Sequence, residues 1–125
     1  MPLATMNTLM NNVYWVLGRK HYIAYDDFVA AVSDYNQRIS PGSSGWDPEK
    51  QISDTPIIVT YEAGWKDEDD TIEVALGEPG KALTMGEALF HLNNATIEFF
   101  KGADCCFFEG LTGLGGARYR LSVGS

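Results

Sequence analysis

Leu83–Gly102 reads LTMGEALFHLNNATIEFFKG and is the longest stretch of the chain with the pattern of an amphipathic helix. At about 100° per residue, its mostly apolar side chains fall on roughly a third of the circumference. These are Met85, Ala88, Leu89, Leu92, Thr96, Phe99 and Phe100. The other side carries Glu87, His91, Asn94, Glu98 and Lys101. A stripe of this width predicts a helix that is buried on one side against a sheet or another helix.

The two ends of this helix carry recognisable signals. Thr84 followed by Glu87 has the spacing of a capping box, in which each side chain bonds the backbone N–H of the other residue. Lys101 is favourable at the negative end of the helix dipole, and Gly102 suits the left-handed position that follows a helix. We therefore expect a helix over 84–101.

Alternating segments flank the helix on both sides. PIIVTYE at 56–62 and TIEVAL at 71–76 predict two strands, because apolar residues recur at every second position. Ile57, Val59, Tyr61, Ile72, Val74 and Leu76 are expected to face inward. After the helix, 105–112 and 117–123 predict a terminal hairpin.

The simplest register of that hairpin pairs Thr112 with Ala117 and Phe108 with Leu121. It also places Glu109 opposite Arg120 as a cross-strand ion pair. The glycine-rich segment Gly110–Ala117 is interpreted as the turn of this hairpin. It is not a phosphate-binding loop, because such a loop opens a helix and an alternating strand follows here.

Upstream, we expect a first hairpin and a second helix. VYWV at 13–16 and the segment 21–24 predict two short strands. DDFVAAVSDYNQRI at 26–39 predicts a helix that is capped by Tyr25 or Asp26. Its expected buried face is formed by Phe28, Val32, Tyr35 and Ile39. Residues 1–12 have no clear period and are expected to form a loose arm.

The predicted fold class is α+β. Residues 13–125 form a single domain in the order ββαββαββ, with an antiparallel sheet of about four to six strands and two helices packed on one face. A chain of 125 residues is long enough for one hydrophobic core. No signal peptide or membrane-spanning stretch is recognisable.

Negative charge is concentrated in one segment. The net charge is −8, and Glu62 to Glu78 alone contains seven acids against one base. The acids are Glu62, Asp67, Glu68, Asp69, Asp70, Glu73 and Glu78. A field of this sign repels nucleic acid and anionic membranes and attracts a basic partner. The consecutive acids lack the spacers and glycine of a calcium loop, so we predict no metal site.

Residues 40–55 form a long segment without periodicity, with Trp46 at its centre. Two interpretations remain open for Trp46. Its ring can attach the loop to the body of the protein, or it can be an exposed recognition residue.

No catalytic or cofactor signature is present, so the sequence favours a binding role over a catalytic one and predicts no cofactor. The histidines are His21 and His91, and neither lies in a recognisable motif. A pairing of Cys106 with His91 stays possible. The adjacent Cys105 and Cys106 are expected to be reduced thiols, which fits the cytoplasm.

The leading hypothesis is a small acidic cytoplasmic protein that binds a basic protein partner, for example an immunity or antitoxin-type protein. The predicted partner-binding residues are Trp65, Asp67, Glu68, Asp69, Asp70 and Trp46. One alternative is a small-ligand protein or enzyme with a pocket between sheet and helices, edged by His21, His91, Cys105 or Cys106. Another is an assembly component of a phage or secretion system that forms homo-oligomers through an edge strand at 117–123.

Overall fold

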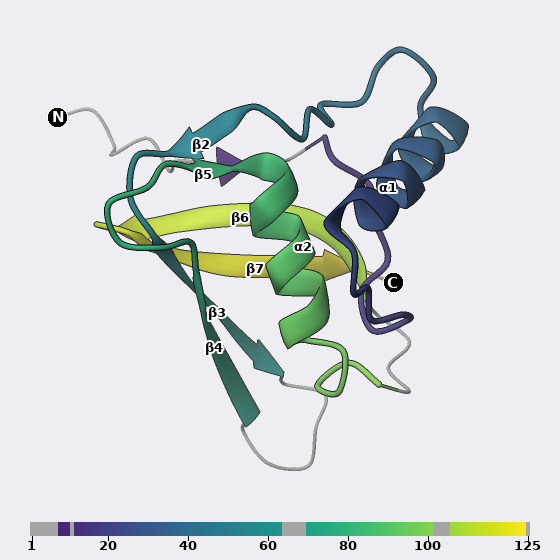
Figure 1. Ribbon diagram of the computed structural model, residues 1–125. Coiled ribbons are helices and arrows are strands. Elements are labelled where there is room, and N and C mark those ends of the chain that lie inside the picture. The colour runs from purple at the N-terminus through teal and green to yellow at the C-terminus, as the bar shows by residue number, and fades with distance from the viewer. Residues whose placement is uncertain (1–7, 11, 64–69, 102–105, 125) are drawn as a thin grey trace, which may run out of the picture.

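The computed structural model describes residues 8–10, 12–63, 70–101 and 106–124, except for the side chains of Ala63 and Asp70. The helices are α1, Tyr25–Ile39, and α2, Met85–Ala95. The strands are β1, Thr8–Leu9; β2, Gln51–Ser53; β3, Ile57–Ala63; β4, Asp70–Leu76; β5, Leu83–Thr84; β6, Phe107–Gly115; and β7, Arg118–Gly124. The α+β class is therefore confirmed (Figure 1).

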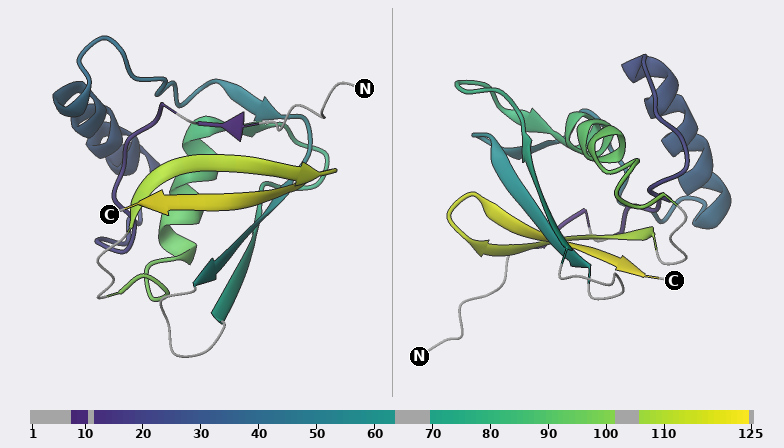
Figure 2. Two further views of the ribbon diagram at one scale, coloured as in Figure 1. Left: turned by 180° about the vertical axis from the view of Figure 1, so that it is seen from behind. Right: turned by 90° about the horizontal axis from the view of Figure 1, so that it is seen from below.

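The main sheet has five strands in the order β1-β6-β7-β3-β4, and β2 pairs with β5 in a separate two-stranded sheet. The expectation of a purely antiparallel sheet was wrong, because β7 runs parallel to β3 with Val59 opposite Tyr119. The physical reason is the connection through α2. The chain leaves β4, crosses one face of the sheet as α2, and returns with the β6–β7 hairpin on the far side of β3 (Figure 2).

This order places β7 in the interior of the sheet, between β6 and β3. The predicted edge strand at 117–123 was therefore wrong. All of β7 pairs with β6, and Arg118–Arg120 also pair with β3, so the first half of β7 has a strand partner on both backbone edges. The described edges of the sheet are β1 and β4.

Helix α2 confirms the central prediction in its first two turns. Thr84 and Glu87 form both halves of the capping box. The side chains that face the sheet are buried, including Ala88, Leu89 and Leu92. The helix ends at Ala95, earlier than expected, and the Thr96 hydroxyl donates to the Leu92 carbonyl at 2.7 Å. The chain continues as turns through residues 96–100.

Helix α1 has the predicted span, but its N-cap is Ala24, which makes no capping bond through its side chain. Phe28 and Val32 are buried as expected, whereas Ile39 is 53% exposed. Tyr35 is half-buried against Trp15, and Asn36 beside it is buried. Phe28 contacts Phe90 of α2 with ring centroids 5.5 Å apart. Helix α1 therefore lies beside α2, on the same side of the sheet (Figure 2).

The predicted first hairpin was wrong: residues 13–24 contain no strand, and Val16 makes only an isolated bridge to Phe107. Asparagine side chains replace the expected strand partner. Asn36 accepts from the Tyr14 N–H and donates to the Tyr14 carbonyl, both at 2.8 Å. Asn94 makes the same two bonds with Tyr22: it accepts from the Tyr22 N–H at 3.0 Å and donates to the Tyr22 carbonyl at 2.7 Å. A primary amide can do this because it carries both donor and acceptor groups.

Some residues before 13 take part in the sheet and in the core. Thr8–Leu9 pairs with β6 as strand β1, and Met10 belongs to the hydrophobic core at 6% exposure. The expected arm at 1–12 therefore contains an ordered strand, since the edge of β6 is open for pairing. Residues 1–7 and 11 lie outside the described part.

The terminal hairpin exists, but its register differs from the prediction. Thr112 pairs with Arg120, Leu111 with Leu121, and Phe108 with Val123. The turn is tighter than expected because Gly115 pairs directly with residue 118, and the positive φ of Gly115, 110°, makes this possible. An irregularity between Phe108 and Gly110 contains Glu109, so Glu109 does not oppose Arg120.

No helix in the described ranges has the length and apolar character needed to cross a membrane.

Candidate functional site

The predicted acidic site falls mostly outside the described residues. This applies to Trp65, Asp67, Glu68 and Asp69. Asp70 is the first residue of β4, where its backbone pairs with Ala63 of β3. The acidic run therefore belongs to the connection between two paired strands, and its role in partner binding stays a prediction.

Trp46 packs against the hydrophobic core as a half-buried ring. Its indole N–H donates to the Ser33 hydroxyl of α1 at 2.9 Å. Nearby, the Gly45 N–H donates to the Asn12 carbonyl at 2.8 Å. The ring thus attaches the 40–55 segment to the body, which confirms the first of its two interpretations. A direct role of Trp46 in partner binding stays a prediction.

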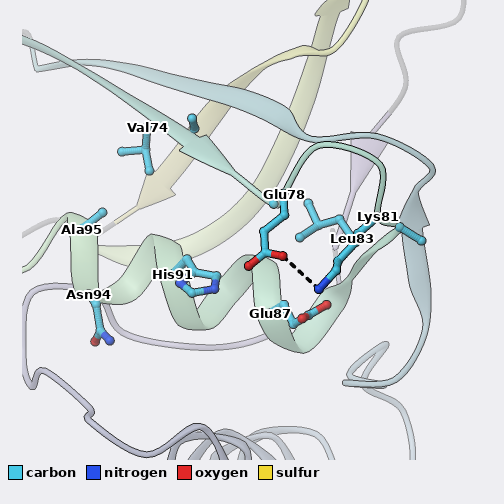
Figure 3. A pocket seen from close by; sticks show the side chains of 11 residues that line it. Val74, Glu78, Lys81, Leu83, Glu87, His91, Asn94 and Ala95 are labelled. Carbon is cyan, nitrogen blue, oxygen red and sulfur yellow. Dashed lines mark ion pairs between the residues drawn. The ribbon is translucent and has the colours of Figure 1, made fainter.

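The outward side of α2 borders a hollow of about 550 Å³ that faces β4 (Figure 3). We call it the β4 hollow. Val74 and Ala75 of β4 line one wall, and Glu87 and His91 of α2 line the other. Glu78, from the loop between β4 and β5, closes one end together with its ion-pair partner, Lys81, at 3.0 Å. The volume lies in the range of known small-molecule sites.

A second hollow of about 490 Å³ lies on the other flank of α2. We call it the Tyr25 hollow. Its lining combines two aromatic rings, Tyr25 and Phe90, with the carboxylates of Glu49 and Glu87. The two rings meet edge to face with centroids 5.5 Å apart. Aromatic walls next to carboxylates suit a cationic group, which both can attract.

Backbone contacts between α2 and the 40–55 segment shape the Tyr25 hollow. The Gly86 N–H donates to the Pro48 carbonyl at 2.9 Å, and the Met85 N–H donates to the Lys50 carbonyl at 2.8 Å. A Cβ at position 86 would collide with the Tyr25 hydroxyl and would lie 2.9 Å from Pro48 Cβ. Glycine at this position therefore allows the loop and the tyrosine to approach the helix.

Glu87 and His91 line both hollows, so the hollows lie next to each other along the outward stripe of α2. We call the two hollows together the α2 surface. It carries the carboxylates of Glu49, Glu78 and Glu87 against the single ammonium group of Lys81, which is already paired with Glu78. Its charge is therefore negative on balance.

The environment of Tyr25 reflects this charge. Burial raises the pKa of its hydroxyl above the ordinary value, and the negative charges of Glu87, Glu49 and Asp26 raise this pKa further. A hydrogen bond with Thr84 acts in the opposite direction. The tyrosine therefore stays a neutral hydrogen-bond donor at physiological pH.

The histidines and cysteines that could take part in catalysis or ligand binding are dispersed over the structure. His21 lines a separate hollow with Tyr22 and Ile23, whereas Cys106 is buried at 2% exposure. His91 lines the α2 surface, and Cys106 is not among the lining residues, so the structure does not bring this pair together at the site. Cys105 lies outside the described residues. Within the described ranges, no group of three or more His, Cys, Asp or Glu residues is arranged to hold a metal ion.

The fold and the site define an α+β domain with an acidic, partly aromatic surface along one helix. Comparison of the chain with protein-family models, with curated proteins and with solved structures finds no match.

Two residues of the α2 surface have a role in the sequence analysis. Glu87 is a capping residue, and His91 lies on the outward flank of the helix and, in the ligand-binding alternative, at the edge of a pocket. The available signal was their i, i+4 spacing, which places them side by side on one helix face. The partners from Tyr25 and Glu49 could not be found in this way, because they are distant in the sequence.

Proposed function

We propose that the protein is a small acidic binding protein that takes up a basic protein partner on its α2 surface. The observation that carries this proposal is the set of three carboxylates around two neighbouring hollows, with the one ammonium group of their lining already paired. Such a surface accelerates the encounter with a positive partner and disfavours acidic ones. Tyr25 and Phe90 add apolar contact area, which carries more binding energy than exposed charges do.

The acidic connection 64–69 between β3 and β4 is the second part of the proposal. Its charges would steer the partner, and Trp65 would be an anchor beside them. An immunity or antitoxin-type protein that covers the cationic groove of a toxin, for instance a nuclease, is the most concrete form of this function. We place it in the cytoplasm, because adjacent cysteines favour a reducing compartment.

The test is a quantitative pull-down from a lysate of the source organism with wild type and three variants. The surface variant is Glu49→Gln, Glu78→Gln and Glu87→Gln, and the connection variant neutralises Asp67, Glu68, Asp69 and Asp70. A matched control neutralises three exposed acids outside both hollows. These are Asp34, Asp54 and Glu98.

A basic protein that wild type and control recover and the surface variant loses supports the proposal. Its binding should also weaken steeply with added salt, as expected for exposed charges. Recovery of the same partners by the surface variant, with unchanged salt dependence, would show that the proposal is wrong. The connection variant separates the contribution of the acidic run from that of the α2 surface.

A small-molecule ligand is a second candidate, because the β4 hollow lies between sheet and helix with His91 at its edge, as that alternative requires. An organic amine would be the matching chemistry, given Glu78 and Glu87. Thermal shift measurements with a panel of primary amines and matched carboxylic acids test it. Stabilisation by amines alone, lost in Glu87→Gln, supports it, whereas equal responses to both classes contradict it.

A further inference from the structure

Strand β4 is an exposed edge of unusual regularity. It forms seven consecutive pairs with β3 without a bulge, whereas the opposite edge strand, β1, has two residues. The sequence of β4, DTIEVAL, contains no proline or lysine, and its charged residues are Asp70 and Glu73. Proteins often protect a long edge with proline, charged side chains or bulges, because a free edge offers N–H and C=O groups to any extended chain. The side of β4 away from β3 has no strand partner among the described residues.

The β4 hollow borders this edge strand. Val74 and Ala75 are consecutive residues of β4, and both line the hollow. The outer edge of β4 has no strand partner among the described residues, so the hollow lies next to a strand with free pairing capacity. The opposite wall is the outward stripe of α2, from Glu87 through His91 to Ala95.

The length of this wall matches a short extended segment. Eight residues separate Glu87 from Ala95, which corresponds to about 12 Å along a helix. An extended chain covers that distance with about four residues. The space between β4 and α2 therefore suits a short strand with its alternate side chains in the hollow.

The carboxylates at one end of the hollow specify the charge of that strand. Glu87 uses Oε1 for its contacts with the Thr84 N–H and hydroxyl, at 3.3 and 3.0 Å. Its Oε2 has no hydrogen-bond partner among the described residues. The Glu78–Lys81 pair is solvent-exposed, with 70% of the Glu78 side chain accessible. Exposed pairs of this kind are weak, so an incoming cation can share Glu78 at little cost.

We infer that the β4 hollow accepts an extended, lysine- or arginine-containing segment of the partner, which adds to β4 as a further strand. A basic side chain of that segment would lie between Glu78 and Glu87. This inference rests on the proposed function and specifies how the basic partner is held. Main-chain hydrogen bonds would supply affinity, and the carboxylates would select the side chain.

A second copy of the same chain fits this edge less well. A copy brings a net charge of −8 and a β4 strand that contains Asp70 and Glu73. Pairing two such strands places like charges close together, which is unfavourable.

The experiment uses blocked hexapeptides of alternating lysine and valine, titrated into isotopically labelled full-length protein and followed by NMR. One peptide is unmodified. The second is methylated at the backbone nitrogen of every lysine, and the third at the backbone nitrogen of every valine. Successive N–H groups of a strand point to opposite edges, so strand addition uses only one of the two sets. A glutamate–valine peptide is the charge control.

We expect the unmodified peptide to shift the backbone amides of residues 72–77. One methylated peptide should bind within about twofold of it, and the other should bind at least about tenfold more weakly, through the loss of two or more hydrogen bonds. Glu87→Gln should weaken binding about two- to fivefold, since exposed charges contribute little. Glu98→Gln is the matched control, because Glu98 is exposed and lines neither hollow.

Equal binding of the two methylated peptides would overturn strand addition. If the Glu87→Gln variant still bound both methylated peptides more weakly than wild type, the proposed function would stand without strand addition. If the protein captures a basic partner but binds none of the peptides, strand addition is refuted and the proposed function is not. Concentration-dependent shifts of the β4 amides without peptide would assign the edge to a second copy and contradict the inference. Failure of both the pull-down and the peptide titration would remove the two proposals together.

Discussion

Replacing Asn93 with alanine should destabilise the protein strongly, because this side chain holds the segment between β1 and α1 against α2. Asn93 is 1% exposed. It accepts from the Trp15 indole N–H at 3.0 Å and donates to the Lys20 carbonyl at 2.9 Å. The alanine variant leaves both of these groups without their partner.

The size of the effect follows from these contacts. An unsatisfied buried polar group costs about 1–3 kcal/mol. Both bonds are only partly buried, so water reaches the orphaned groups to some extent and the lower part of that range applies. Two groups then lower the free energy of unfolding by about 2–3 kcal/mol. For a domain of this size, that loss lowers Tm by about 8–12 °C.

Urea and thermal unfolding followed by circular dichroism measure this loss. The matched partner variant is Trp15→Phe, which removes the indole N–H and keeps an aromatic ring beside Phe28 and Tyr35. In the wild type, the centroids of these two rings lie 5.4 and 5.7 Å from that of Trp15. In a double-mutant cycle with Asn93→Ala we expect a coupling energy of about 1 kcal/mol. A loss below about 0.5 kcal/mol, the usual range of a surface substitution, or strictly additive effects would refute the reasoning.

The remaining predictions concern the α2 surface. Gly86→Ala should lower Tm by several degrees, because the added Cβ would collide with the Tyr25 hydroxyl and with Pro48. Adding Tyr25→Phe should recover part of this loss. No recovery would argue against the tyrosine contact. Thr84→Ala should cost about 1 kcal/mol in chemical unfolding, whereas Glu87→Gln should cost under about 0.5 kcal/mol, because glutamine also completes a capping box. Equal losses in the two variants would contradict the capping argument. Burial and neighbouring carboxylates raise the pKa of Tyr25, so its contribution to stability is present below pH ~10 and is lost as pH rises through the raised pKa. The difference in unfolding free energy between wild type and Tyr25→Phe should therefore shrink in alkaline solution, and a pH-independent difference would show that the hydroxyl titrates normally.

Local patterns predicted the elements that depend on nearby residues. The capping box of α2, the alternation of β3 and β4, and the span of α1 all follow from spacings of a few residues, so they could be predicted well. The hairpin predicted at 13–24 is absent because the backbone partners of this segment come from distant parts of the chain. Asn36, Asn93 and Asn94 bond the backbone of Tyr14, Lys20 and Tyr22. The backbone of Cys106 and Phe108 bonds that of Leu17 and Trp15.

The candidate site shows the same division between local and distant information. The outward position of Glu87 and His91 follows from helical spacing alone. Their combination with Tyr25, Glu49 and the edge of β4 required the folded chain, because these residues come from segments far apart in the sequence.

By itself, the sequence determined an acidic α+β domain and the amphipathic helix at its centre, since charge and periodicity are properties of neighbouring residues. Only the tertiary structure decided that β7 lies beside β3 and that β4 remains an open edge next to α2. Strand order depends on whether the chain, after α2 has crossed the sheet, adds its next strands beside β3 or beside β4. That choice is made by packing between segments far apart in the chain, and no local pattern records it.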